Sequence, residues 1–341
     1  MKFLFFTDSH FHLFSNYSKP DEDFVNDRFK EQVKTLQKVF DIAREEQAEI
    51  IFGGDLFHKR NSVDTRVYNK IFEVFANNQD IKVHMLRGNH DSVTNSLYTS
   101  SSIEPIGYLP NVYIYSYPDT FSFTDINLVF EPYGDETAEI KEHIKKSYDE
   151  NKVNILVAHL GVEGSLTGKG SHRLEGAFGY KDLLPDKYDF ILLGHYHRRQ
   201  YFDNKNHLYG GSLMQQSFSD EQEANGVHLI DTEKLTTKFI ELDTRRFITI
   251  QGDNAPDNLE ELINEGHFIR FIGTPEQAKV FELDKEMEDK NIQVQMKKDY
   301  VVEKRIDSDV SDSPISITSS YADKYYPESK SELIECLKEV L

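Results

Sequence analysis

Short apolar runs alternate with longer amphipathic segments through the first two-thirds of the chain. The five strongest apolar runs are KFLFF (2–6), AEIIFGG (48–54), IKVHML (81–86), VNILVAH (153–159) and YDFILLGH (188–195). Amphipathic helical patterns occupy residues 28–46 and 63–77 between them. Apolar strands that alternate with helices predict an α/β sheet domain. Weaker strand-like runs at 112–117, 126–132, 226–231 and 237–242 add antiparallel pieces.

The pattern changes near residues 243–247, where we expect a domain boundary. Beyond it, short strand-like and helical runs, including a helical run at 275–290, predict a small α+β unit. Residues 307–320 have the composition of a polar linker. An amphipathic helix is predicted at 329–341, with one apolar side formed by Leu333, Ile334, Leu337 and Leu341. We therefore expect three regions: 1–245, 246–305 and 306–341.

Composition limits where the protein works. No apolar run approaches the roughly 20 residues of a membrane span, and the start MKFLFF is too short for a secretory signal. A single cysteine, Cys336, excludes an intrachain disulfide and a thiolate-rich metal site. We therefore expect no membrane attachment and a cytoplasmic location, which would be the host cytoplasm if a virus encodes the chain.

The charge bears on possible partners. Lys and Arg number 39 and Asp and Glu 59, which gives a net charge of −20. This lowers the expectation of a nucleic-acid substrate, because DNA affinity depends on cations that meet phosphates. An acidic chain can still act on DNA where bound metal ions and local basic clusters neutralise the site.

Metal-binding residue types follow each of the five strong strands. They are Asp8 and His10, Asp55, Asn89 and His90, His159, and His195 and His197. A lone Asp or His at a strand end is usually a cap or turn residue, but five strands in succession make coincidence a poor explanation. Ligands tend to gather at the carboxyl ends of strands in α/β sheets, so we expect these side chains to form one site.

The chemistry of this set suggests two metal ions. Nitrogen and oxygen donors without cysteine suit Mn²⁺, with Fe²⁺, Zn²⁺ or Mg²⁺ as alternatives. The seven of these residues other than His90 exceed the needs of one ion and fit two ions about 3.5–4 Å apart, as in phosphoryl-transfer enzymes. Such a pair needs a bridging carboxylate, and Asp55 is the best candidate.

The motifs resemble a known family. DSH (8–10), GGD (53–55), RGNHD (87–91), AHLG (158–161) and GHYH (194–197) resemble the calcineurin-like metallophosphoesterase superfamily. A finer resemblance is to SbcD-type nuclease subunits, through GDLFH (54–58), RGNHD, LLGHYHRRQ (192–200) and the segment 209–231. The resemblance implies a β-sandwich flanked by helices in 1–245, a capping domain that contacts DNA in 246–305, and a tail with a partner-binding helix in 306–341.

Residue roles follow from the resemblance. It implies that one metal is held by Asp8, His10, Asp55 and His197, and the other by Asp55, Asn89, His159 and His195. It also implies that His90 is the general acid that protonates the leaving oxygen, a role suited to histidine at neutral pH.

Two further histidines lie beside these motifs. Phosphatases of the superfamily carry aspartate where this chain has His58, so His58 is interpreted as a group that handles substrate or supports His90, or else as a solvated loop residue. Nuclease relatives usually have leucine and glycine after the first histidine, whereas here the motif reads DSHFH. The extra His12 is interpreted as a surface or groove residue rather than a ligand.

The glycine-rich segment GSLTGKGS (164–171) does not fit a phosphate-binding P-loop, because Glu163 and Gly170 occupy positions that need glycine and Ser or Thr. A flexible basic loop is the better interpretation. With the HKR cluster at 58–60, Arg87 and Arg198–Arg199, it predicts positive charge near the site that could meet a DNA backbone.

The pattern of apolar residues also suggests that the chain forms an oligomer. The helix at 63–77 has a wide apolar face formed by Val67, Ile71, Val74, Tyr68, Phe72 and Phe75. Core burial is the default explanation, but SbcD-type relatives dimerise near here, and a homodimer is expected. The resemblance implies that the terminal helix binds an SbcC-like SMC-family ATPase, although folding back on its own domain is an equal alternative.

The sequence thus predicts a two-metal, Mn²⁺-dependent DNA nuclease subunit, with Mg²⁺ or another divalent ion as alternatives. It would act as an exonuclease and endonuclease on DNA ends and hairpins, with an ATPase partner, in DNA repair, recombination or replication. Two other classes are a superfamily phosphatase or small-molecule phosphodiesterase, and a non-catalytic scaffold. The intact ligand set with His90 argues against the scaffold.

Overall fold

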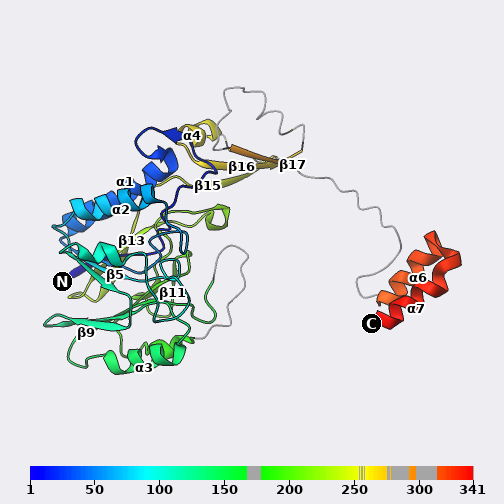
Figure 1. Cartoon of the computed structure of the whole chain (residues 1–341). Helices are drawn as coiled ribbons and strands as arrows, with labels where there is room; N and C mark the ends of the chain where they lie inside the picture. Colours follow the sequence, from blue (N-terminus) through cyan, green and yellow to red (C-terminus); the bar gives the residue numbers. More distant parts are fainter. Residues whose placement is uncertain are drawn as a thin grey trace. The chain divides into compact units, whose positions relative to one another are not determined.

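The computed structural model describes residues 1–166, 178–252, 254, 256, 258–274, 277, 292–296 and 313–340 (Figure 1). The chain falls into two compact units, Met1–Met296 and Lys297–Leu341. Among the described residues, no helix has both the length and the apolar character that crossing a bilayer requires.

The first sheet has the strand order β14-β13-β1-β4-β5-β6. Its parallel strands are β1 (Lys2–Phe6), β4 (Glu49–Phe52), β5 (Val83–Leu86) and β6 (Val112–Tyr115). The strands β13 (Gly226–Asp231) and β14 (Thr236–Glu241) add an antiparallel edge. The strong strands predicted at the start of the chain are therefore neighbours in one sheet.

The second sheet has the order β11-β12-β10-β9-β8-β7. Its parallel strands are β8 (Ile126–Glu131), β9 (Val153–His159), β10 (Phe190–Gly194) and β12 (His207–Tyr209). Antiparallel strands close both edges: β7 (Asp119–Ser122) and β11 (Gln200–Tyr201).

The two sheets pack face to face because their strands are apolar on both sides. Phe3 and Phe5 of β1 share one buried cluster with Ile155 and Val157 of β9, whereas the alternate residue Leu4 faces the helices. The helices α1 (Asp27–Glu46) and α2 (Thr65–Asn77) cover the first sheet, and α3 (Thr137–Ser147) covers the second (Figure 1). The predicted β-sandwich flanked by helices is confirmed.

Local signals set the helix ends. The side chain of Asn26 accepts a hydrogen bond from the backbone of Phe29 at the start of α1, and Asp64 does the same for Arg66 at α2. Short 3-10 helices lie at η1 (Glu104–Tyr108), η2 (Tyr180–Leu183) and η3 (Phe218–Asp220), and a two-strand hairpin comprises β2 (Pro20–Asp21) and β3 (Val25–Asn26).

A smaller sheet follows the sandwich in the same unit. Its parallel strands are β15 (Phe247–Gln251), β16 (Phe268–Gly273) and β17 (Ile292–Met296), with α4 (Leu259–Asn264) between the first two. Arg245 joins it to α1 through ion pairs with Asp27 (2.8 Å) and Glu31. The helix predicted at 275–290 lies outside the described residues apart from Gln277.

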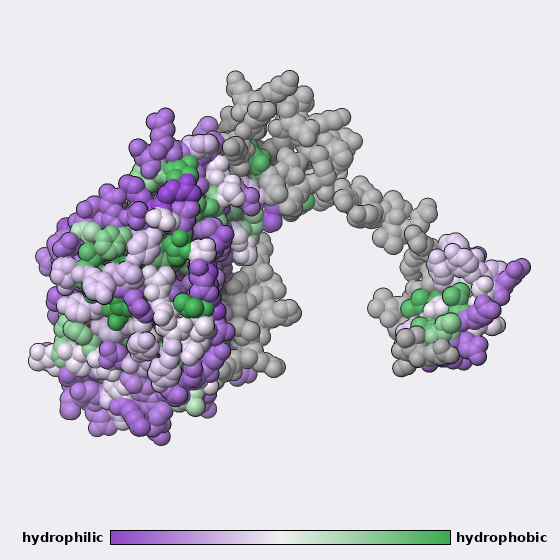
Figure 2. Space-filling view, in the orientation of Figure 1, coloured by the Kyte–Doolittle hydropathy of each residue, from purple (hydrophilic) through white to green (hydrophobic). Residues whose placement is uncertain are grey.

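The terminal unit contains α6 (Pro314–Tyr325), η5 (Pro327–Ser329) and α7 (Lys330–Val340). The terminal helix is confirmed, but the linker prediction is wrong for residues 314–320, which are helical. The helix begins here because Ser313 caps it through its side chain and Pro314 stands at its first turn. Ile317 and Leu333 are exposed in this unit, where apolar residues gather on one side (Figure 2).

Candidate metal centre

The predicted ligands lie at or just after the carboxyl ends of β1, β4, β5, β9 and β10. Backbone hydrogen bonds tie the first two loops together, because the N–H of Asp8 donates to the carbonyl of Gly54 (2.9 Å) and that of His10 donates to Asp55 (3.1 Å). The N–H of His195 donates to the carboxylate of Asp8 (3.1 Å), which links the loops of the two sheets. The structure therefore brings residues from both sheets to one place.

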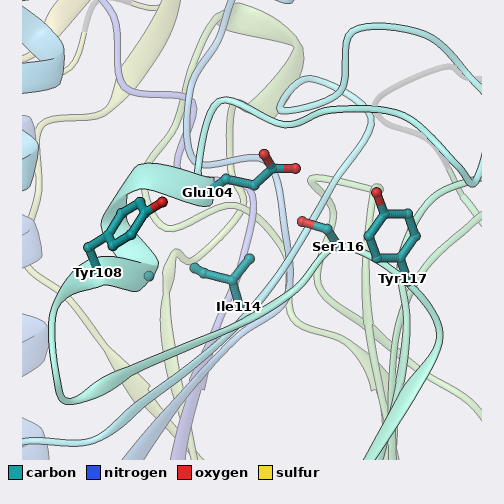
Figure 3. Close-up of a pocket in the computed structure, with 6 residues that line it drawn as sticks. Glu104, Tyr108, Ile114, Ser116 and Tyr117 are labelled. Carbon is teal, nitrogen blue, oxygen red and sulfur yellow. The ribbon is translucent and has the colours of Figure 1, made fainter.

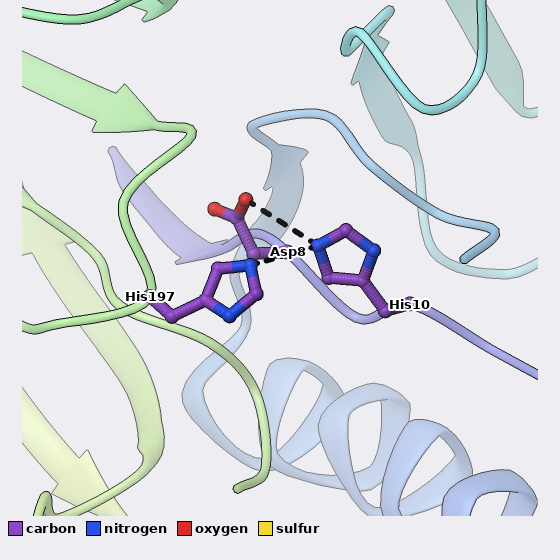
Figure 4. Close-up of side chains that lie close together, drawn as sticks. All are labelled: Asp8, His10 and His197. Carbon is purple, nitrogen blue, oxygen red and sulfur yellow. Dashed lines mark hydrogen bonds and ion pairs between the residues drawn. The ribbon is translucent and has the colours of Figure 1, made fainter. Parts of the chain in front are cut away.

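Asp8, His10 and His197 form a first group of donor atoms (Figure 4). The Nε2 atoms of His10 and His197 are 2.9 Å apart, and His10 Nε2 is 3.9 Å from a carboxylate oxygen of Asp8. Asp8 and His10 are buried, whereas His197 is partly exposed. The group thus faces the outside on one side only.

A second group forms around Asn89. Its side-chain oxygen is 3.0 Å from His159 Nε2 and 3.0 Å from His195 Nδ1. The Nδ1 of His159 lies 2.8 Å from the carbonyl of Gly53, and because a carbonyl only accepts, Nδ1 carries the proton and Nε2 is free to coordinate.

Asp55 lies between the two groups. The same oxygen, Oδ2, is 3.6 Å from His10 Nε2 and 3.4 Å from His159 Nε2. Metal–ligand bonds of about 2.0–2.2 Å place neighbouring ligand atoms at right angles about 3 Å apart. The spacing of these nitrogen and oxygen atoms therefore fits two divalent ions, and the position of Asp55 fits a bridging carboxylate.

The backbone at this site is strained. Four predicted ligands have positive φ angles: Asp8 (52°), His10 (47°), Asp55 (61°) and His195 (95°). Such conformations cost about 1–3 kcal/mol each in non-glycine residues and persist where function requires them. Gly54 has φ 104°, and a Cβ there would lie 2.4 Å from His159 Nδ1, so only glycine fits beside that ring.

The electrostatics are also unusual. Burial raises the pKa of Asp8, although His159 and His197 oppose the shift. Burial acts in the same direction on Asp55, but His159, His10 and His90 together outweigh it and hold the pKa of Asp55 far below its ordinary value. Burial lowers the pKa of His10, and burial with the charge of His159 lowers that of His195 to about 3.

Among the described residues, neither buried carboxylate forms an ion pair with Lys or Arg. Burying two carboxylates that have only histidines, and no permanently charged Lys or Arg, as partners is unfavourable. The donor set is therefore best satisfied by bound cations.

His90 lies next to Asp55 and His10. Its backbone N–H donates to Asp55 Oδ1 (2.7 Å), and its Nδ1 donates to the backbone carbonyl of His58 (2.5 Å). His90, His10 and Asp55 also offer donor atoms within 4.8 Å of one another. Because Nδ1 is occupied by a carbonyl, Nε2 is the atom of His90 that can exchange a proton.

His58 belongs to neither group of donor atoms, nor does it join the cluster of His90, His10 and Asp55. Its ring lies 5.9 Å from that of His90 and 5.3 Å from that of His12, measured between centroids. Its Nδ1 is buried with no hydrogen-bond partner among the described residues. Burial, with the charges of His12 and His90, lowers its pKa to about 4.

Two supporting residues had no such role in the sequence interpretation. The carboxylate of Asp91 accepts hydrogen bonds from the backbone N–H groups of Asp55 (2.9 Å), Leu56 (2.9 Å) and Gly88 (3.0 Å). Burial and the charge of Asp55 raise its pKa to about 6. Arg60 donates to the carbonyl of Asn89 (2.8 Å). In the sequence, only the positions of Asp91 in RGNHD and of Arg60 in HKR point to these supporting roles.

The prediction that these basic residues supply positive charge near the site is partly wrong. Arg87 is fully buried and donates to Ser116, Ser92 and Leu97, so it cannot meet a phosphate backbone. Arg198 pairs with Glu223 at 3.0 Å. The basic loop around Lys169 and Arg173 lies outside the described residues.

Comparison with known proteins agrees with this geometry. The family model described as calcineurin-like phosphoesterase matches residues 1–199, which include every predicted ligand. The chain therefore belongs to the calcineurin-like phosphoesterase family, and it is a hydrolase with a site for divalent metal ions.

Two relatives with more specific names are similar to this chain. A protein from Staphylococcus saprophyticus, named as the D subunit of the nuclease SbcCD, is 25% identical over 273 residues, covering 71% of this chain and 71% of that protein. One of the same name from Staphylococcus epidermidis is 25% identical over 74% of this chain and 72% of its own length. A solved dimetal phosphatase from Danio rerio aligns with a TM-score of 0.44 and 10% identity over 67% of this chain and 91% of that one, which is too distant to support a functional inference.

Proposed function

We propose that this chain is the nuclease subunit of an SbcCD-like complex. It would hydrolyse phosphodiester bonds at DNA ends and hairpins with two Mn²⁺ ions, and work with an SMC-type ATPase in DNA repair, recombination or replication. The observation that carries the proposal is the pair of donor groups that share Asp55, with His90 beside them. The names of the relatives support the choice of DNA.

The assignment of ligands follows the two groups of donor atoms. Asp8, His10 and His197 would hold one ion, and Asn89, His159 and His195 the other, with Asp55 between them. When bound, the ions lower the pKa of a water and offset the negative charge of the phosphate. The backbone of Asp55 is held by Asp91, which keeps the carboxylate between the two groups.

His90 would protonate the leaving oxygen. The hydrogen bond from Nδ1 to the carbonyl of His58 fixes the ring and leaves Nε2 as the site of the transferable proton. After transfer, the neutral ring keeps its Nδ1–H and the same hydrogen bond. General acid catalysis of this kind typically contributes about 10²–10⁴-fold.

Three exposed features support the proposed partners. The exposed Ile317 and Leu333 of the terminal unit fit a helix-binding surface on an ATPase partner. For a homodimer, α2 carries partly exposed Tyr68 and Phe72, and a hollow between η1 and β6 has Tyr108 and Tyr117 on its rim (Figure 3). Tyr108 is 92% exposed, which is unusual for an aromatic side chain without a partner.

One assay tests the function. Purified protein is incubated with linear duplex DNA, a DNA hairpin and a phosphopeptide, each with Mn²⁺, Mg²⁺ or EDTA. We expect cleavage of both DNA substrates with Mn²⁺, none with EDTA, and no release of phosphate from the peptide. Hydrolysis of the phosphopeptide alone would contradict the proposal and favour a phosphatase.

A further inference from the structure

A hollow of about 260 Å³ opens beside the metal centre. It is lined by the loop 12–17 after β1, by Arg28 of α1, by His58, by residues 216–218 and by the start of β15. None of the proposed ligands lines it. The small sheet and the sandwich both contribute, so the hollow lies where the two parts of this unit meet.

Aromatic rings form two walls of the hollow. The first consists of His12, Phe14 and His58, with ring centroids 5.0 Å apart for His12–Phe14 and for Phe14–His58. The second wall consists of Tyr17, Phe218 and Phe247, with centroids 5.6 Å apart for Tyr17–Phe218 and 4.9 Å for Phe218–Phe247.

Arg28 spans the floor between the walls. Its Cζ lies 4.0 Å from the ring centroid of Phe14 and 5.3 Å from that of Phe247. Its guanidinium is buried and donates to the carbonyls of Asn16 (3.1 Å) and Gln216 (2.7 Å), which fixes its plane. A rigid cation between aromatic faces favours a flat, electron-rich ring as ligand.

Two residues that line the hollow also carry hydrogen-bonding atoms without a partner among the described residues. Gln216 directs its amide nitrogen to the carbonyls of Ser9 (3.2 Å) and Met214 (3.2 Å), which leaves its side-chain oxygen as an acceptor. That oxygen and His58 Nδ1 are buried without hydrogen-bond partners among the described residues. A buried polar atom left unpaired is unfavourable, so both atoms would gain from a ligand with a polar edge.

The position of the hollow indicates which ligand this is. The ring of His58 lines the hollow and also lies 5.5 Å from His10 and 5.9 Å from His90. A phosphodiester at the metal centre would therefore place an attached nucleoside beside the hollow. A nucleobase has the two features that the hollow selects, a flat aromatic face and a polar edge.

We propose that this hollow binds the base of the nucleotide next to the scissile phosphate. The inference rests on the proposed nuclease function and specifies its substrate. A base between two aromatic walls cannot remain paired or stacked in a duplex, so the preferred substrate is a DNA end whose terminal nucleotide is unpaired.

The test compares a single-stranded oligonucleotide with the same strand whose terminal nucleotide lacks its base. We expect kcat/KM of the wild-type protein to be about tenfold higher for the strand with the base, since base–aromatic stacking has an effect of this size. Phe14→Leu, and independently Phe218→Leu on the opposite wall, remove one aromatic face, and each is expected to lower this ratio towards one. Phe24→Leu, at a ring outside the hollow, is the matched control and keeps the wild-type ratio.

A binding measurement adds a readout that does not depend on hydrolysis. A strand ending in 2-aminopurine, mixed with protein in EDTA, is expected to lose fluorescence on binding because the base stacks, and to lose less with Phe14→Leu. Equal kcat/KM for the two strands in the wild-type protein would overturn the base-binding site and leave the nuclease function standing. No cleavage of either strand with Mn²⁺ would instead contradict the nuclease function itself.

Discussion

Asp55 stands where the two groups of donor atoms meet, and both its backbone and its side chain are constrained there. Its φ of 61° turns the carboxylate inward, where one oxygen faces His10 and His159 and the other accepts from the backbone of His90. Asp8 also has oxygens within 4.8 Å of donor atoms in both groups, but the single Oδ2 atom of Asp55 lies within 3.6 Å of a nitrogen in each. Its function therefore depends on how firmly the surrounding loop is held.

Asp91 supplies that support, which leads to a prediction. Asp91→Asn replaces an oxygen that accepts from backbone N–H groups with an amide nitrogen that cannot accept. Loss of such an outer contact typically weakens metal binding about 10–100-fold. We expect this loss in a Mn²⁺ titration, with the folded state retained by circular dichroism. Asp41→Asn, at an exposed position on α1, is the control, and equal Mn²⁺ affinity in all three proteins would refute the role of Asp91.

At the scale of elements, the apolar pattern was sufficient to predict the five strands that position the site, because their residues are buried on both faces of the sheets. The same pattern predicted α1, α2 and α7. Arg87 could not be assigned from sequence, since its partners Ser116 and Leu97 are brought to it only by tertiary folding. The start of α6 was missed because Ser313 and Pro314 occur equally in linkers and at helix starts.

The contact between β8 and α3 gives a pH-dependent prediction. Glu131 of β8 is fully buried, bonds to His143 of α3 through one oxygen, and has no partner among the described residues for the other. Burial raises its pKa from 4.5 to about 7, and the bond to Glu131 raises the pKa of His143. Both groups bind protons more tightly in the folded state, so the stability that this pair contributes is fully present below pH 4.5, the ordinary pKa of Glu131, and is lost as pH rises to about 7.

Glu131→Gln removes the buried acid and is expected to flatten this dependence. Relative to the variant, the wild-type protein loses up to about 3 kcal/mol of unfolding free energy between pH 4.5 and pH 7. Urea unfolding at pH 5 and pH 8 measures the difference, with Glu142→Gln on the exposed side of α3 as control. A constant difference between wild type and Glu131→Gln at both pH values would show that Glu131 is ionised throughout.

At the scale of the whole molecule, the net charge of −20 contrasts with the proposed DNA substrate. Bound metal ions would offset the acidic centre, and Lys59 is an exposed cation next to His58. A homodimer would bring two such metal centres to one DNA molecule. The apolar face of α2 has a buried part and a partly exposed part. Val67, Ile71 and Phe75 are buried, whereas Tyr68 and Phe72 form a strip that remains partly exposed.

If this partly exposed strip is the dimer interface, Phe72→Glu is expected to give a folded monomer that still binds Mn²⁺, because an interface that excludes water also excludes an unpaired charge. Asn69→Glu adds the same charge at an exposed position of α2 and leaves the assembly unchanged. Sedimentation velocity distinguishes the species. If Phe72→Glu remains a dimer, α2 is not part of the interface. If the variant unfolds, the side chain of Phe72 belongs to the core.

The central claim is the division of roles within GDLFH, and the metal content of two variants tests it most directly. Asp55→Ala removes the oxygen shared by both groups of donor atoms, whereas His58→Ser keeps the backbone carbonyl that accepts from His90 and touches no donor group. Elemental analysis of protein saturated with Mn²⁺ and freed of excess metal is expected to give about two ions per chain for wild type and His58→Ser, and none for Asp55→Ala. Wild-type metal content in Asp55→Ala, or loss of metal in His58→Ser in step with it, would contradict the claim.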